Sequence, residues 1–298
     1  MGTSKTSTGP GKNVPLVPNW VAPDSPSPPT KAPPLTAPGD GSPSAPKRPP
    51  DRNPDQPNPE KKPDQKPPAE QAPPRRFTSA RRAVGNFAKT GDTRSLRNAL
   101  GNYVRGGYGG SGTAARRMSK SSSAAGGVYN ILSGGASAEA DAADAPSLDV
   151  RTLAGLPHSE IAERIADAVN PGDVSLDDAG VREAVAEAVS SVLSENETAD
   201  ITNLPSELIE ECYVRTLAMS AFNIIIADIG ASLQRAAHGN AGLANDRLKE
   251  ISDFMREAYR AQYTKFKERG GQVSRRTAKS IAQSVTSQVM DIFESYLE

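Results

Sequence analysis

Gly2 is the residue of this chain whose position could most directly support chemistry. The opening sequence MGTSKTSTGPGKN fits the pattern M-G-x-x-x-[ST] at Met1, Gly2 and Thr6, which is an N-myristoylation motif. Two other interpretations stay open. The terminus could be a flexible peptide that enters the cleft of a partner, or it could lack a function, because small second residues are common and chain ends are often disordered.

A second group of candidate residues surrounds the glycine-rich stretch GGYGGSG at 106–112. This stretch contains G-x-G-x-x-G, but the dinucleotide-binding fingerprint needs a preceding strand, and the preceding NALGNYVR has a helical pattern. The YVRGGYGG sequence also contains one RGG-type element, a kind that binds RNA when it is repeated. The side chains that could contact phosphates or other anions here are Arg105, Arg116, Arg117 and Lys120.

The residue types that commonly carry catalysis or bind metals form no recognisable set. His158 and His238 are the two histidines, and neither has a cysteine, histidine or carboxylate at a spacing typical of zinc or iron ligands. Cys212, the single cysteine, follows Leu208 and Ile209 on an apolar face, which is typical of a core residue. No G-x-S-x-G or H-E-x-x-H motif occurs. We therefore expect no enzymatic activity, no metal and no cofactor.

Two very different parts of the chain must position these residues. Of the 26 prolines in 298 residues, 22 lie between Pro10 and Pro74. A segment so rich in proline and polar residues cannot bury enough apolar surface to offset the entropy of ordering it. Repeated prolines favour an extended polyproline II conformation. We predict a disordered, proline-rich arm over 1–75, which would hold its terminus away from the folded body.

The zero net charge hides an opposition between the two halves. Residues 1–140 carry 20 Lys/Arg against 9 Asp/Glu, whereas residues 141–298 carry 15 against 26. The most basic stretch is 75–120, with 11 basic residues and only Asp92 opposing them. This asymmetry favours either a basic segment for an anionic partner or two halves that contact each other.

Helical periodicity dominates the chain after the arm, and no strand with two-residue alternation occurs. Segment 76–133 is predicted to form short basic helices broken by glycine, with Asp92 as an N-cap and a glycine loop at 106–112. The sequence GGASAEADAADAPS within 134–147 is predicted to be a linker.

The remaining segment, 148–298, is predicted to be an acidic domain of long amphipathic helices, with Ser159 and Ser206 as N-caps. The fold class predicted from these patterns is all-α, a bundle of several long amphipathic helices preceded by the disordered arm. We make no prediction about self-association.

The most apolar stretch, 212–233, is long enough to span a bilayer. It contains Arg215 and Asp228, and charged groups in hydrocarbon are costly, so we predict a buried helix of a soluble domain. No signal peptide is visible, and a single cysteine cannot form an intramolecular disulfide. We therefore expect a cytoplasmic protein without a membrane partner.

Several stretches together resemble the QatB family of the bacterial Qat anti-phage defence system. They are MGTSKTSTGPGKNVPLVPNW, RRFTSARRAVGNFAKTGDTRSLRNALGNYVRGGYGGSGTAARRM and AAGGVYNILSGG. The resemblance covers residues 1–135 best, and the helical C-terminal half fits in composition and length only. It implies a non-enzymatic member of a four-protein operon whose other products are an ATPase, a QueC-like enzyme and a TatD-like nuclease.

The resemblance also implies a role for the terminus. QueC-like enzymes activate a carboxylate with ATP and join it to an amine, and here the amine would be the α-amino group of Gly2, which is exposed when Met1 is removed. Glycine has no Cβ to hinder attack, and an N-terminal amine with a pKa of about 8 is partly neutral near pH 7. Thr3, Ser4 and Trp20 would be recognised by the partner, since Trp20 lies in an apolar cluster within polar sequence.

Two classes of function therefore stay open. The first is an adaptor or protein substrate whose N-terminal tail is modified. The alternative is a nucleic-acid-binding helical scaffold that uses the basic residues of 75–120.

Overall fold

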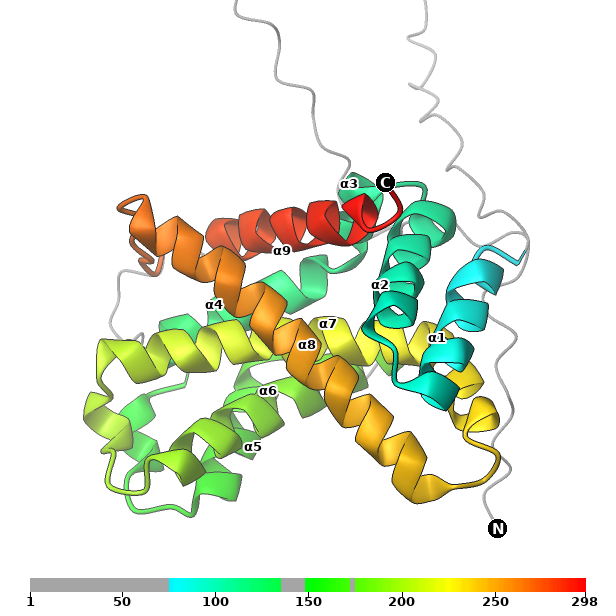
Figure 1. Ribbon diagram of the computed structural model, residues 1–298. Helices are drawn as coiled ribbons and strands as arrows, with labels where there is room; N and C mark the ends of the chain where they lie inside the picture. The colour runs from blue at the N-terminus through cyan, green and yellow to red at the C-terminus, as the bar shows by residue number, and fades with distance from the viewer. Residues whose placement is uncertain (1–74, 135–147, 172–174) are drawn as a thin grey trace, which may run out of the picture. The chain divides into compact units, whose positions relative to one another are not determined.

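The computed structural model describes residues 75–134, 148–171 and 175–298. Within these residues the secondary structure is helical throughout and includes no strand, which confirms the predicted all-α class (Figure 1). The predicted arm and linker fall almost wholly outside this part of the chain.

The helices are α1 (Thr78–Thr90), α2 (Thr93–Asn102), α3 (Ser111–Arg117), α4 (Ser119–Leu132), α5 (His158–Val169), α6 (Leu176–Glu195), α7 (Ser206–Ala236), α8 (Ala241–Glu268) and α9 (Ala278–Ser295). Three short elements join them: the π-helix η1 (Tyr103–Gly107) and the 3₁₀ turns η2 (Val150–Leu153) and η3 (Ile201–Asn203).

Helix α7, the longest described helix, packs against four others. It contacts α1, α4, α6 and α8, and Figure 1 shows α8 crossing it. Its side chains are buried on several sides between Ile209 and Leu233. It is also the one described helix long and apolar enough to cross a membrane, but 61% of its most apolar window is buried by the rest of the protein. The prediction of a buried helix over 212–233 is therefore confirmed.

Two main clusters of buried side chains form the core of the described residues. The larger one joins α1, α2, η1 and α3 to α7, α8 and α9, with Phe87, Tyr103, Tyr259 and Phe293 among its fully buried aromatics. The second joins α4, α5 and α6 to the N-terminal part of α7, including Cys212. In both clusters, side chains from 76–133 thus pack against side chains from the helices that follow residue 148.

The predicted helix boundaries agree with the structure at some positions and fail at others. Asp92 caps α2, because its carboxylate accepts hydrogen bonds from the backbone N–H groups of Arg94 and Ser95, as predicted. The predicted caps Ser159 and Ser206 are wrong, since Pro157 and Pro205 hold the N-cap positions of α5 and α7. Both prolines have an extended ψ that lets their carbonyl oxygens accept the first helical hydrogen bonds.

The predicted glycine loop at 106–112 is also wrong in its extent. Helix α2 continues into the π-helix η1, and α3 begins already at Ser111. Gly109 and Gly110 form the turn between them, with φ values of 75° and 133° that favour glycine. Because a π-helix closes its hydrogen bonds over five residues, it brings Tyr103 and Tyr108 toward one side of the chain, which an α-helix would not do.

Candidate functional site

The N-terminal candidates Gly2, Thr3, Ser4 and Trp20 lie outside the described residues. The geometry that the structure provides concerns the basic segment 75–120 and the helices that it contacts. The predicted roles of these four residues therefore stay predictions.

A largely buried carboxylate on α7, that of Asp228, anchors the glycine-rich part of the basic segment. The hydroxyls of Tyr103 and Tyr108 donate hydrogen bonds to Oδ2 of Asp228, at 2.9 and 3.0 Å. The guanidinium of Arg81 donates to the backbone carbonyl of Asp228, at 2.7 Å from Nη2. Asp228 is one of the two charges inside the apolar stretch, and its partners all come from α1, η1 and the turn that follows.

Burial dominates the electrostatics of this carboxylate. It raises the pKa of Asp228 above its ordinary value of 3.8, although the two tyrosine hydrogen bonds and the positive charges of Arg117 and Arg76 favour the ionised form. Burial and the nearby carboxylate together raise the pKa of Tyr108 to about 12, so this phenol remains a hydrogen-bond donor near neutral pH. These hydrogen bonds make Asp228 an anchor for the two tyrosines. Shifted pKa values of this kind also occur in groups whose role is structural.

An aromatic cluster lies directly where the described chain begins. Phe77 stacks on Tyr103 at 5.2 Å between ring centroids, and Tyr108 packs edge-on against both rings. The guanidinium of Arg76 lies over the rings of Phe77 and Tyr108, at 4.7 and 4.8 Å. A Cβ at Gly107 would lie 2.5 Å from the ring of Phe77, so only glycine fits this close approach. The first residues after 74 are thus held firmly against η1.

The four basic residues predicted to contact anions have different surroundings in the structure. Arg105 is exposed on η1, and Arg116 donates to the hydroxyl of Thr113 at 3.2 Å. Arg117 and Lys120 instead form ion pairs with the first turn of α6. Their predicted contact with nucleic acid stays a prediction.

These ion pairs connect the basic and the acidic parts of the chain. Arg117 donates to Asp177 at 2.7 Å, and Lys120 forms a short contact with Asp178. Burial alone would raise the pKa of Asp178, but hydrogen bonds from Lys120 and Ser175 outweigh it, and the pKa is lowered below 3.8. Of the two explanations for the charge asymmetry, contact between the halves is therefore supported by specific pairs.

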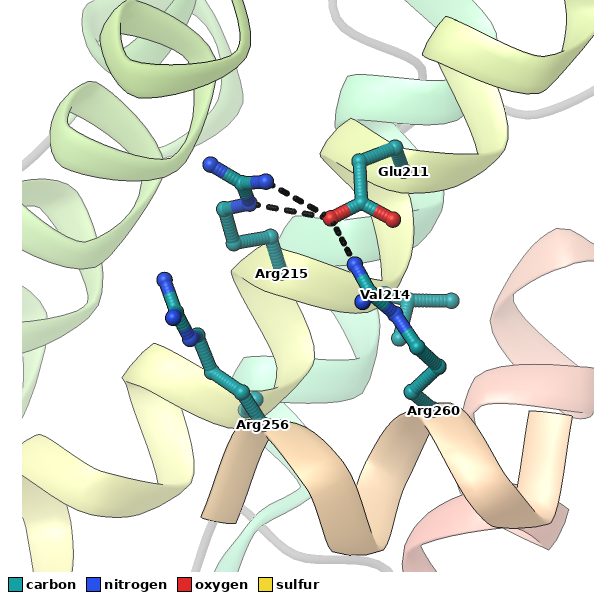
Figure 2. Close-up of a pocket in the computed structure, with 6 residues that line it drawn as sticks. Glu211, Val214, Arg215, Arg256 and Arg260 are labelled. Carbon is teal, nitrogen blue, oxygen red and sulfur yellow. Dashed lines mark hydrogen bonds and ion pairs between the residues drawn. The ribbon is translucent and has the colours of Figure 1, made fainter. Parts of the chain in front are cut away.

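A polar cleft of about 490 Å³ lies between α6, α7 and α8. Three arginines and three carboxylates line it, so its charges balance and it offers no net attraction for an anion. Its lining residues are Glu195, Arg215, Asp253, Arg256, Glu257 and Arg260. Figure 2 shows a smaller pocket that shares Arg215, Arg256 and Arg260 with this cleft, and in which Arg215 and Arg260 both reach Glu211.

Arg215 is the second charge inside the apolar stretch, and it joins two helices. Its guanidinium donates to Glu195 of α6 at 2.8 and 2.9 Å and to Glu211 of α7 at 2.8 Å. Its side chain is 7% exposed, although both partner carboxylates reach solvent. From the sequence alone, the charge of Arg215 indicated only that the apolar stretch does not span a membrane. The i,i+4 spacing of Glu211 and Arg215 could have predicted the ion pair between these two residues. Nothing in the sequence indicated the contact with Glu195.

The remaining candidates for catalysis do not come together. Cys212 is buried in the core, and burial raises the pKa of its thiol to about 12, which leaves it unreactive near neutral pH. His158 begins α5 and lines a cavity of about 200 Å³, whereas His238 is exposed after α7. The described residues contain no group of three or more side chains suited to hold a metal ion.

The fold and these contacts define a class of protein: an all-α protein whose basic, aromatic-rich N-terminal helices are held on a long central helix by buried polar groups. The family model of QatB, the Qat anti-phage system associated protein, matches residues 109–293. Because this match spans more than half of the chain, the chain belongs to the QatB family and is a component of a Qat anti-phage system. Searches of curated proteins and of solved structures gave no match.

The position of the match extends the resemblance seen in the sequence. That resemblance was strongest over 1–135, whereas the family model covers 109–293 and thus most of the C-terminal helices. These helices had offered no diagnostic motif.

Proposed function

We propose that this protein is a non-enzymatic adaptor and protein substrate of a cytoplasmic Qat system. Its helical body binds partner proteins, and its N-terminal tail is presented to a QueC-like enzyme. The observation that carries the proposal is membership of the QatB family. The glycine-led terminus supports it, since it precedes a segment with 22 of the 26 prolines and could reach a partner's active site while the body stays bound elsewhere.

The proposed modification is the formation of an amide on the α-amino group of Gly2, which becomes free when the Met1–Gly2 peptide bond is hydrolysed and Met1 is removed. ATP activates a carboxylate of the second substrate by transferring its adenylyl group, and pyrophosphate leaves. The amino nitrogen of Gly2 then attacks the carboxyl carbon, AMP leaves with one carboxylate oxygen, and the amine loses a proton. A free terminal amine suits this step, because its pKa of about 8 leaves a useful neutral fraction at pH 7.

The residues around Gly2 would provide recognition. Thr3 and Ser4 have short hydroxyl side chains that can hydrogen-bond within a narrow cleft without steric hindrance. Trp20 offers a large apolar contact that could hold the arm on the partner's surface. The other products of the operon, an ATPase and a TatD-like nuclease, are the proposed partners of the helical body.

The test is the mass of the N-terminal peptide from full-length protein produced with and without the QueC-like enzyme. We expect a mass increase on the peptide that begins at Gly2, and only when the enzyme is present. Gly2→Val should abolish it, because a branched side chain crowds the amine while Met1 is still removed. Lys5→Arg is the matched control: it removes the nearest other amine and should leave the modification intact. An unmodified Gly2 in both preparations, or a modification on Lys5, would contradict the proposal.

A further inference from the structure

The connection between α8 and α9 carries exposed basic side chains that have no part in the proposed function. We call this cluster the basic turn; it consists of Lys265, Lys267, Arg269, Arg275, Arg276 and Lys279. These six belong to the 15 basic residues of 141–298, a part of the chain with 26 acidic residues. The basic turn is thus a local positive surface within the acidic part of the protein.

Few carboxylates neutralise the basic turn. Lys267 donates to Glu210 at 2.6 Å, and Glu268 is the only acidic residue between 265 and 281. Residues 265–281 therefore contain six basic residues against one acidic residue. Arg275 is bound to the backbone carbonyl of Ser133. The other four members of the basic turn form no ion pair within the described residues. These four are Lys265, Arg269, Arg276 and Lys279.

Helix stability explains only part of this cluster. Lys265 and Lys267 lie in the last turn of α8, where cations complement the negative end of the helix dipole. Arg275, Arg276 and Lys279 instead flank the start of α9, whose first turn contains no acidic residue. Cations are disfavoured at that end of a helix. Arg275 has a role in the fold, because it binds Ser133 after α4. The fold gives no such reason for Arg276 and Lys279, which points to a use outside it.

We infer that the basic turn is a contact surface for the phosphate backbone of a nucleic acid. Gln272, an exposed amide between the cations of α8 and those of α9, can also donate a hydrogen bond to a phosphate oxygen. A protein-binding surface would instead be expected to be poor in lysine and to present an apolar or aromatic anchor. The apolar side chains of the turn, Phe266 and Val273, are half-buried and pack on the larger core cluster.

The basic turn is separate from the basic segment 75–120, for which the sequence suggested contact with nucleic acid. It lies at the N-terminal end of α9, whereas the C-terminal end of α9 contacts the basic segment, with Glu294 accepting from the backbone N–H of Ser111 at 2.8 Å. Figure 1 shows the α8–α9 turn on the opposite side of the view from α1 and α2. The inference does not depend on Gly2 or on any partner of the proposed function, so either can fail alone.

The test uses the full-length protein and fluorescein-labelled duplexes of about 30 base pairs, one of DNA and one of RNA, titrated by anisotropy between about 50 and 200 mM KCl. We expect an affinity that falls with salt. The triple variant Arg269→Gln, Arg276→Gln and Lys279→Gln should bind at least tenfold more weakly at the lowest salt. Its slope of log affinity against log salt should become shallower by about 0.9 for each phosphate that the variant no longer neutralises. The two duplexes distinguish DNA from RNA as the source of the phosphates.

The matched control makes the same change of charge at three exposed residues outside both the basic turn and the segment 75–120, with Arg151→Gln, Arg235→Gln and Lys249→Gln. Its affinity should stay close to that of the unchanged protein. Absence of binding to both duplexes at the lowest salt would overturn the inference, as would an equal weakening in the two triple variants. Tighter binding to anionic lipid vesicles or to polyglutamate would also overturn it. If the triple variant does not fold, the single variant Arg276→Gln replaces it. Its slope of log affinity against log salt should then be shallower than that of the unchanged protein.

Discussion

Asp228 illustrates how one residue can limit the stability of this protein. Its carboxylate is largely buried on α7 and accepts hydrogen bonds from Tyr103 and Tyr108. Burial nevertheless raises its pKa, so the folded state holds the proton more tightly than the unfolded chain does. Stability from this group is fully present below the ordinary pKa of 3.8 and is lost as the pH rises through the raised value.

We predict that Asp228→Asn makes the protein at least as stable as the unchanged chain at pH 7. An amide oxygen can accept both tyrosine hydrogen bonds, and the variant has no buried charge to desolvate. The difference in free energy of unfolding between the variant and the unchanged protein should therefore shift in favour of Asn as the pH increases from 4 to 8. Urea denaturation at several pH values measures this difference.

Two further variants show whether hydrogen bonding or charge decides the result. Asp228→Ala should cost about 2–4 kcal/mol, since it leaves two buried hydroxyls without an acceptor. Asp246→Asn, at an exposed position of α8, should change stability little at any pH. If Asp228→Asn became less stable with increasing pH, the raised pKa would be wrong.

Burial of single residues could be predicted from the sequence, but their partners could not. The apolar stretch around Cys212 predicted a core helix, and the position of Asp92 before a helical pattern predicted its cap; both are confirmed. Asp228 pairs with Tyr103 and Tyr108, which are 125 and 120 residues away. Helical periodicity describes one segment at a time, so it contains no information about such contacts.

At the scale of elements, the π-helix η1 depends on the absence of a side chain at one position. We predict that Gly107→Ala destabilises the protein by about 1–3 kcal/mol, because its Cβ would lie 2.5 Å from the ring of Phe77 and force that ring away from Tyr103. Thermal unfolding followed by circular dichroism measures the loss. Gly112→Ala in α3 is the control, since nothing lies within 4 Å of its Cβ, and it should be neutral or slightly stabilising. Equal effects of the two substitutions would contradict the close approach.

The contact between α6 and α7 depends on Arg215 in a similar way. We predict that Arg215→Met costs about 1–3 kcal/mol of unfolding free energy, because Glu195 and Glu211 lose the guanidinium that joins them. The control is Arg256→Met on the rim of the same cleft, where the arginine is 46% exposed and bound to Asp253 of its own helix. That change should stay within about 0.5 kcal/mol. Chemical denaturation separates the two, and a negligible loss for Arg215→Met would show that packing alone holds α6.

The existence of these elements was easier to predict than their ends or their packing. The helical pattern of 148–298 correctly predicted long helices, which are α6 to α9 in the structure. The start of α5 and the extent of the glycine loop were wrong. In the first case Pro157 fixed the boundary. In the second, burial of Tyr103 and Tyr108 favoured a π-helix over the loop that the nearby glycines predicted.

At the scale of the whole molecule, some of the opposed charges of the two halves form ion pairs with each other. Arg117 and Lys120 of the basic segment bind Asp177 and Asp178 at the start of α6, where acidic side chains also complement the helix dipole. This arrangement also limits the candidate site, because two of the four predicted anion-binding residues are paired within the chain.

A double-mutant cycle between Lys120 and Asp178 tests this internal contact. We predict a coupling energy of about 1 kcal/mol at pH 7 from Lys120→Met, Asp178→Asn and the double variant, because the pair is largely shielded from solvent. The pKa of Asp178 is lowered, so the coupling should be complete above the ordinary value of 3.8 and disappear as the pH falls below it. Arg151 and Asp149, an exposed pair that does not join the halves, serve as the control cycle and should show little coupling. A coupling between Lys120 and Asp178 no larger than that of the control pair would mean that apolar packing alone joins the basic and acidic parts of the chain.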